Sequence, residues 1–126
     1  QPLTIIGDGE QRRPFTGVTK CVKAIAGLLD CAASRGEVVN IGGTAELSIN
    51  ELAAYVLRLT GSKAGTRHLT YEAAYGHDFD DMRRRNPDTT RLRELLGWAP
   101  EESIEDILIP IIGHIRGQMG NPKPRP

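Results

Sequence analysis

Short apolar runs alternate along this chain with apolar residues at helical spacing. Each run is bounded by glycine or polar turn residues, which is typical of a short strand. The predicted strands cover residues 3–6, 15–18, 37–41 and 68–71. Apolar residues three and four positions apart predict helices. The predicted helices cover about residues 20–34, 49–60, 89–96 and 104–115. Residues 71–85 show no clean period, and the whole order predicts a mixed α+β fold with one core.

Capping residues mark where the second and third helices begin and end. Ser48 and Glu51 have the spacing of a capping box, in which each side chain bonds the other residue's backbone N–H. Gly61 follows the last apolar position of that helix, as a C-terminal glycine does. Asp88 is placed to cap the next helix, and Gly97 ends it.

The first and last helices have weaker signals. Thr19 is placed to cap the first helix, and the apolar positions of that helix have helical spacing. They are Val22, Ile25, Ala26 and Leu29. Ser103 and Asp106 open the last helix, and Pro110 lies inside it, where proline removes a hydrogen bond and favours a kink.

Size and charge limit what the chain can do. Its 126 residues suffice for one ordinary domain, which we place at residues 1–116, followed by a Gly- and Pro-rich tail at 117–126 that we expect to be disordered. The 16 basic and 16 acidic residues balance, so a general attraction to nucleic acid is not expected. No apolar run approaches the roughly 20 residues that a membrane span needs.

The cysteines and histidines suggest no redox or metal chemistry. Cys21 and Cys31 lie in one predicted helix, and ten helical residues separate Cα atoms by about 15 Å, beyond the reach of a disulfide. Free thiols, with no signal-peptide pattern at the start of the sequence, indicate a cytoplasmic protein. The three histidines are scattered and form no metal-ligand motif. They are His68, His77 and His114.

Arginines gather in two polar segments that are far apart in the sequence. In residues 7–15 a Gly-Asp-Gly turn leads to Arg12 and Arg13, and in residues 83–88 three arginines precede a predicted helix. A guanidinium matches phosphate oxygens, and a helix N-terminus favours a bound anion. The alternative is that both segments are solvated surface, with the arginines neutralised by nearby aspartates. These aspartates are Asp78, Asp80 and Asp81.

Three motifs in this order resemble the extended short-chain dehydrogenase/reductases. Residues 3–16, LTIIGDGEQRRPFT, resemble the family's L-T-x-x-G-D-G-x-Q-x-R-x-F segment. Residues 38–43, VVNIGG, resemble its N-I-G-G strand, and RRRNPD at 83–88 with LLGWAP at 95–100 resembles its R-x-P-D and L-G-W-x-P signature. The resemblance covers about residues 1–116. It is strongest to the nucleotide-sugar epimerases, decarboxylases and dehydratases related to UDP-glucose 4-epimerase.

The resemblance implies a role for five residues in binding a UDP- or dTDP-sugar. Arg13 stands where the family's Q-x-R arginine contacts the diphosphate. Arg85 stands where a second arginine contacts phosphate or ribose, with Arg84 as its competitor. Asp88 stands where some members hold the ribose, and Gln11 is expected to order the loop before Arg13.

The resemblance also shows what these residues lack. Family members bind NAD through a glycine-rich turn after a first strand, and these 126 residues contain no such motif. The family's catalytic Tyr-x-x-x-Lys is missing too, because the residues four positions after the three tyrosines are Leu59, Tyr75 and Phe79. We therefore assign no catalytic, cofactor-binding or metal-binding residue here and expect the chain to be the C-terminal substrate-binding part without its Rossmann half.

Two functions remain open. In one, the chain is a nucleotide-sugar-binding domain that is not catalytic alone. In the other, it is a degenerate fragment that acts as a structural or protein-interaction module. In either case the apolar surface that the Rossmann half would cover is expected to favour self-association, through residues 38–41 or the last helix.

Overall fold

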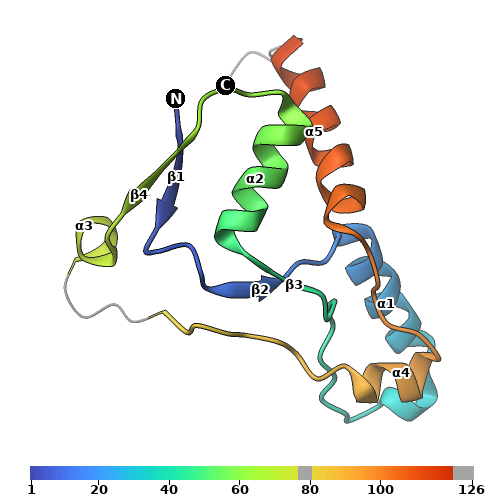
Figure 1. Ribbon diagram of the computed structural model, residues 1–126. Helices are drawn as coiled ribbons and strands as arrows, with labels where there is room; N and C mark the ends of the chain where they lie inside the picture. The colour runs from blue at the N-terminus through green and yellow to red at the C-terminus, as the bar shows by residue number, and fades with distance from the viewer. Residues whose placement is uncertain (77–80, 121–126) are drawn as a thin grey trace, which may run out of the picture.

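The computed structural model describes residues 1–76 and 81–120 (Figure 1). Within them, four short strands, five α-helices and one 3-10 helix follow one another in mixed order, which confirms the α+β class. The elements are β1 (Leu3–Ile6), β2 (Arg12–Pro14), α1 (Val18–Asp30), η1 (Ala32–Ser34), β3 (Glu46–Ser48), α2 (Ile49–Thr60), β4 (Thr66–Leu69), α3 (Tyr71–Tyr75), α4 (Thr90–Leu96) and α5 (Ile104–Gly120).

The strands form two separate pairs. β1 runs parallel to β4, with Leu3 opposite Thr66, and β2 runs antiparallel to β3, with Arg12 opposite Ser48. The strand predicted at 3–6 is confirmed. The strand predicted at 68–71 begins and ends two residues earlier, because the Thr70 side chain accepts a hydrogen bond from Ala73 N and starts α3.

Two predicted strands are wrong. Residues 37–41 form no strand, since in the described structure their backbone has no neighbouring strand with which to pair, and Val38 is 93% exposed. Residues 15–18 are not a strand either, because backbone pairing ends at Pro14 and Gly17 is the N-cap of α1. The predicted cap at Thr19 is wrong for the same reason.

The other helix boundaries follow the predicted capping residues closely. Ser48 and Glu51 form the capping box of α2, and Gly61 ends that helix in the left-handed conformation, with φ of 69°. Ser103 Oγ accepts from Asp106 N, and the Asp106 carboxylate accepts from Ser103 N, so this pair opens α5 in the same way.

The last helix is longer than predicted. α5 contains Pro110 and continues to Gly120, past the domain boundary that we expected at residue 116. Residues 121–126 of the predicted tail lie outside the described residues. No helix in the described ranges has the length and apolar character required to cross a membrane.

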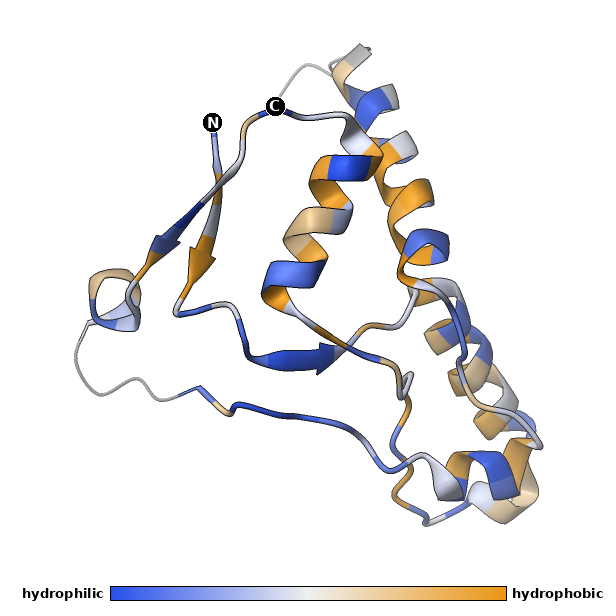
Figure 2. Ribbon diagram, in the orientation of Figure 1, coloured by the Kyte–Doolittle hydropathy of each residue, from blue (hydrophilic) through white to orange (hydrophobic). Residues whose placement is uncertain are grey.

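The hydrophobic core is small and lies between α1 and α4. Ala24, Leu92 and Ala99 are buried there. Partly buried apolar residues pack around them, and these are Leu28, Val39, Ile41, Leu96 and Trp98. A second contact joins α2 to α5, whose apolar sides lie next to each other in Figures 1 and 2.

Helix α1 turns its apolar stripe away from this core. Val18, Val22, Ile25 and Leu29 are 75%, 58%, 50% and 82% exposed, so this apolar face, which holds three of the four positions with helical spacing, lies on the surface. The inward face of α1 instead carries Ala24 and Leu28. We call the four exposed residues the α1 stripe. The free cysteines, Cys21 and Cys31, lie in and just after this helix.

Candidate functional site

The two arginine-rich segments lie side by side in the structure. Arg12 N donates a hydrogen bond to Arg83 O at 2.9 Å, and Arg12 and Arg84 form a parallel bridge. The segment after residue 80 therefore runs along β2, on the edge opposite β3, before it reaches α4 (Figure 1). Residues that the sequence separates by about seventy positions are brought to one place.

Three ion pairs attach residues 81–84 to the rest of the chain. Arg83 Nη1 lies 2.6 Å from Asp8 Oδ2, and Arg84 Nη2 lies 2.6 Å from Glu46 Oε2. The pKa of Glu46 is lowered, chiefly by its hydrogen bond from Arg84. The pKa of Asp8 is lowered by the backbone N–H of Glu10 and, next, by Arg83. The third pair joins Asp81 to Arg13.

Arg13 is held from two sides. Its Nη2 donates to Asp81 Oδ1 at 2.6 Å, and its Nη1 donates to the carbonyl oxygen of Arg12 at 2.8 Å. Its side chain is only 20% exposed. A guanidinium has five N–H donors, so Arg13 keeps donors for a ligand even while it holds Asp81.

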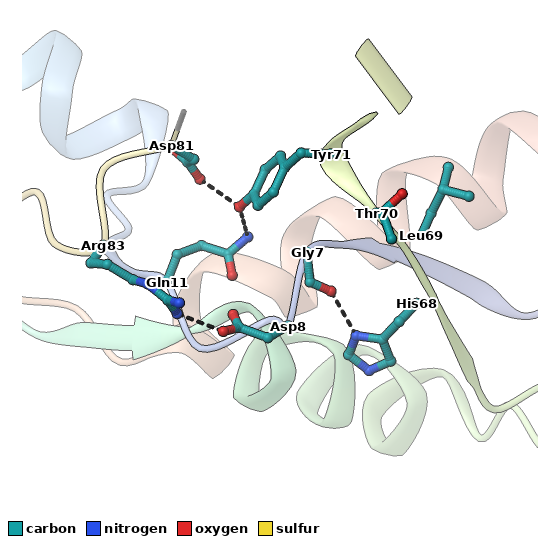
Figure 3. Close-up of a pocket in the computed structure, with 9 residues that line it drawn as sticks. All are labelled: Gly7, Asp8, Gln11, His68, Leu69, Thr70, Tyr71, Asp81 and Arg83. Atoms are coloured by element: carbon teal, nitrogen blue, oxygen red, sulfur yellow. Dashed lines mark hydrogen bonds and ion pairs between the residues drawn. The ribbon is translucent and has the colours of Figure 1, made fainter. Parts of the chain in front are cut away.

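Gln11 and Tyr71 extend this contact into a chain of hydrogen bonds. Gln11 Nε2 donates to Ile6 O and to Tyr71 Oη, both at 3.0 Å. Tyr71 Oη donates to Asp81 Oδ2 at 3.1 Å, and Figure 3 shows the two bonds of Tyr71. Burial, followed by the hydrogen bond to Asp81, raises the pKa of the Tyr71 phenol. Gln11 is buried, and its side chain links the residues just before Arg13 to the carbonyl oxygen of Ile6 in β1.

Arg13 and Arg85 line one hollow of about 540 Å³, which we call the arginine hollow. It is lined by Arg13, Pro14, Thr16, Asn40, Ile41, Gly42, Arg85, Asn86 and Pro87. Arg85 is exposed and makes no hydrogen bond or ion pair with any described residue. A side chain at position 42 would lie 3.0 Å from Pro87 Cγ, so Gly42 lets the two walls approach closely.

Arg84 and Asp88 lie outside the arginine hollow. Arg84 contacts the carboxylate of Glu46 through both Nε and Nη2. Asp88 Oδ1 accepts from Thr90 N at 2.9 Å, which stabilises the first turn of α4, although the N-cap itself is Thr89. The N-cap position is therefore one residue later than predicted, but the Thr89 side chain makes no capping hydrogen bond.

Next to the ion pairs is a second pocket, of about 460 Å³, shown in Figure 3. We call it the Tyr71 pocket, and it is lined by Gly7, Asp8, Gln11, His68, Leu69, Thr70, Tyr71, Asp81 and Arg83. The sequence motifs indicated no site role for Tyr71, and they indicated Asp81 only as a surface counter-charge to the arginines. The two other aspartates of that prediction, Asp78 and Asp80, lie outside the described residues.

The family's NAD site is a glycine-rich turn between a strand and a helix. In the described residues, the connection from β2 to α1 contains one glycine, Gly17. Here β3 passes directly into α2, and only Thr70 separates β4 from α3. The Gly7–Gly9 turn leads from β1 into β2 and opens no helix. Among the residues described there is also no group of three or more metal-ligating side chains.

Comparisons with known proteins agree with these motifs. A family model for GDP-mannose 4,6-dehydratase matches residues 1–110. UDP-N-acetyl-alpha-D-glucosaminuronate decarboxylase from Bacillus cytotoxicus is 38% identical over 103 residues, which is 82% of this chain and 32% of that protein. UDP-glucuronic acid decarboxylase 1 from Xenopus tropicalis is 33% identical over 133 residues, covering 100% of this chain and 30% of that protein. The chain thus spans about a third of the length of the curated relatives it matches.

Solved structures have the same fold over nearly the whole chain. An epimerase from Methanothermobacter thermautotrophicus superposes with a TM-score of 0.85 at 26% identity, covering 95% of this chain and 34% of that one. UDP-glucuronic acid 4-epimerase from Bacillus cereus, in complex with UDP-glucuronic acid and NAD, gives 0.79 at 28% identity, covering 93% of this chain and 36% of that one. This chain belongs to the GDP-mannose 4,6-dehydratase family of nucleotide-sugar epimerases, decarboxylases and dehydratases, within the extended short-chain dehydrogenase/reductases.

Proposed function

We propose that this chain is the nucleotide-sugar-binding part of an NAD-dependent epimerase or dehydratase, and that its ligand is a UDP- or dTDP-sugar. The observation that carries the proposal is that Arg13 and Arg85 line one hollow, although they are far apart in the sequence. Arg13 keeps guanidinium donors beyond its pair with Asp81, and Arg85 has no partner among the described residues, so a diphosphate can supply acceptor oxygens to both. Two solved relatives contain UDP-sugars, which supports this ligand class.

In this proposal the chain binds and orients the substrate but does not transform it. Arg13 and Arg85 hold the diphosphate, Gln11 orders the loop that carries Arg13, and Asp88 supports the ribose side from the start of α4. NAD, where it is bound in such enzymes, accepts and returns the hydride. No residue of this chain is assigned to that step, and the isomerase or lyase activity of a whole enzyme is not assigned to these residues.

Titration calorimetry with UDP tests the proposal. We expect wild-type chain to bind UDP weakly, with a Kd on the order of 0.1–1 mM. Charge-assisted hydrogen bonds contribute about 1.5–3 kcal/mol each, so Arg13→Ala and Arg85→Ala should each weaken binding about tenfold or more. Arg58→Ala is the matched control, because Arg58 pairs with Glu105 and lines neither hollow. The proposal fails if wild-type chain binds no UDP at millimolar concentration, or if both arginine variants bind as well as wild type.

A protein-interaction role is the second candidate, and the α1 stripe favours it. Four apolar residues on one helix face are exposed by half or more. Contiguous apolar surface of this kind is typical of protein contacts. We propose that the isolated chain self-associates through this stripe. A cytoplasmic location is part of both proposals and is supported by the free thiols of Cys21 and Cys31.

A further inference from the structure

The ion pair between Arg13 and Asp81 lies between two hollows. Arg13 lines the arginine hollow, whereas Asp81 lines the Tyr71 pocket. The two side chains are 20% and 27% exposed, compared with 75% and 51% for the pair of Arg83 with Asp8. The Arg13–Asp81 pair is therefore the better shielded of the two, and its electrostatic interaction is less weakened by solvent.

We propose that Asp81 is the internal counter-ion of Arg13 and that it sets the affinity of the arginine hollow for anions by competing with them. This inference rests on the proposed function, since it concerns the same arginine. Asp81 keeps Arg13 neutralised while no ligand is bound. An anion that approaches Arg13 must then share the guanidinium with a fixed carboxylate.

The Asp81 carboxylate is fixed because it is anchored at both oxygens. Oδ1 accepts from Arg13, and Oδ2 accepts from the Tyr71 phenol. Tyr71 in turn accepts from Gln11, which is bound to the carbonyl oxygen of Ile6 in β1. Such a carboxylate cannot swing away freely when a phosphate group arrives, so its negative charge stays near the ligand.

The direction in which anion affinity changes when the Asp81 charge is removed distinguishes a competing role from a purely structural one. If Asp81 served only to position Arg13, removing its charge would loosen the guanidinium and weaken anion binding. If Asp81 competes with the ligand, removing its charge frees a donor of Arg13 and removes a like-charge repulsion, so anion binding becomes tighter. The repulsion also grows with the charge of the ligand.

Calorimetry on the full 126-residue chain at low ionic strength separates the two cases. The variants are Asp81→Asn, which keeps the size of the side chain, and Asp81→Ser, which shortens it. The ligands are UDP, inorganic phosphate and pyrophosphate. We expect both variants to bind UDP about tenfold more tightly than wild type, with a larger gain for pyrophosphate than for phosphate. Glu105→Gln is the control, since it changes the net charge equally at an ion pair that joins α5 to α2.

The outcomes distinguish this inference from the proposed function. Tighter UDP binding by the Asp81 variants than by wild type, with Glu105→Gln unchanged, supports the counter-ion. If wild type binds UDP, Arg13→Ala weakens it and the Asp81 variants are equal to or weaker than wild type, the counter-ion is overturned and the proposed function stands. If neither wild type nor the Asp81 variants bind any of the three ligands, both are overturned.

Discussion

Arg84 contacts the carboxylate of Glu46 through two nitrogens, Nε at 2.7 Å and Nη2 at 2.6 Å. The next residue, Arg85, has no such partner among the described residues and faces the arginine hollow. The R-x-P-D motif matches Arg85 best, with its neighbour Arg84 as the competitor. The structure separates them by their contacts, since Arg84 is paired with Glu46 whereas Arg85 lines the arginine hollow.

Replacing each arginine with alanine should therefore affect a different property, stability for Arg84 and UDP affinity for Arg85. Arg84→Ala is expected to lower the melting temperature modestly and to change UDP affinity by less than about twofold, because it removes an attachment outside the hollow. Arg85→Ala is expected to leave the melting temperature unchanged and to weaken UDP binding about tenfold. Thermal melts and calorimetry on both variants check this, and the reverse pattern would exchange the two assignments.

The isolated chain is expected to show no epimerase, dehydratase or decarboxylase turnover. The reason is chemical, because hydride transfer needs a bound dinucleotide and a Tyr/Lys pair, and these 126 residues contain neither motif. The measurement is conversion of UDP-glucose with added NAD, followed by chromatography, together with a direct NAD titration. Formation of UDP-galactose by the purified chain would contradict the assignment.

Leu92 is expected to be the most sensitive apolar position. It is fully buried in the core between α1 and α4. Leu92→Ala should lower the free energy of unfolding by about 2–5 kcal/mol, through lost burial and the cavity left behind. Val38→Ala is the control, because Val38 is 93% exposed and the change should alter stability by less than about 0.5 kcal/mol. Urea denaturation followed by circular dichroism measures the free energy of unfolding of both variants. Equal losses of stability in the two would show that Leu92 is not in the core.

Self-association should depend on the α1 stripe. Leu29→Glu and Val22→Glu place charge on that face, so each should shift the chain toward monomer in sedimentation velocity at high concentration. An equivalent change on α5, Met119→Glu, tests the alternative that the last helix carries the contact, since Met119 is also 78% exposed. A wild-type chain that is monomeric at all concentrations would rule out both surfaces.

Acid should unfold the chain through its capping and paired carboxylates. The pKa of Asp106 is lowered chiefly by hydrogen bonds from Ser103, and that of Glu51 chiefly by the backbone N–H of Ser48. A lowered folded-state pKa means that these groups add stability above their unfolded pKa, near 4, and lose it as pH falls through the folded value. We expect stability to be flat from about pH 6 to 8 and to fall below about pH 5. In the Asp106→Asn variant, the loss of stability below about pH 5 should be smaller. Thermal melts at several pH values measure this loss.

Local signals predicted local structure well and long-range structure poorly. The boxes at Ser48 and Ser103 and the terminal glycine at Gly61 were correct because a cap depends on residues three or four positions apart. The strand expected at 37–41 failed because an apolar run says nothing about whether another strand lies beside it. Helical spacing located most of the apolar face of α1, but it does not say which face of a helix meets the core.

The candidate site was predictable only in part for the same reason. Motifs located Gln11, Arg13 and Arg85, since each lies within a short recognisable segment. Tyr71 and Asp81 were missed because their importance comes from contact with Gln11 and Arg13, across sixty and sixty-eight positions respectively. No local pattern carries that information.

The pairing of β1 with β4 has a consequence for how the chain reaches its native state. Leu3 lies opposite Thr66, so this sheet forms only after more than sixty intervening residues have been drawn into a closed loop. Closing such a loop is opposed by chain entropy, and folding rates fall as contacts join more distant parts of the sequence. This pairing cannot form until residues 66–69 are available to β1. We expect α2, with its local caps, to form early and the β1–β4 sheet to form in the slow step.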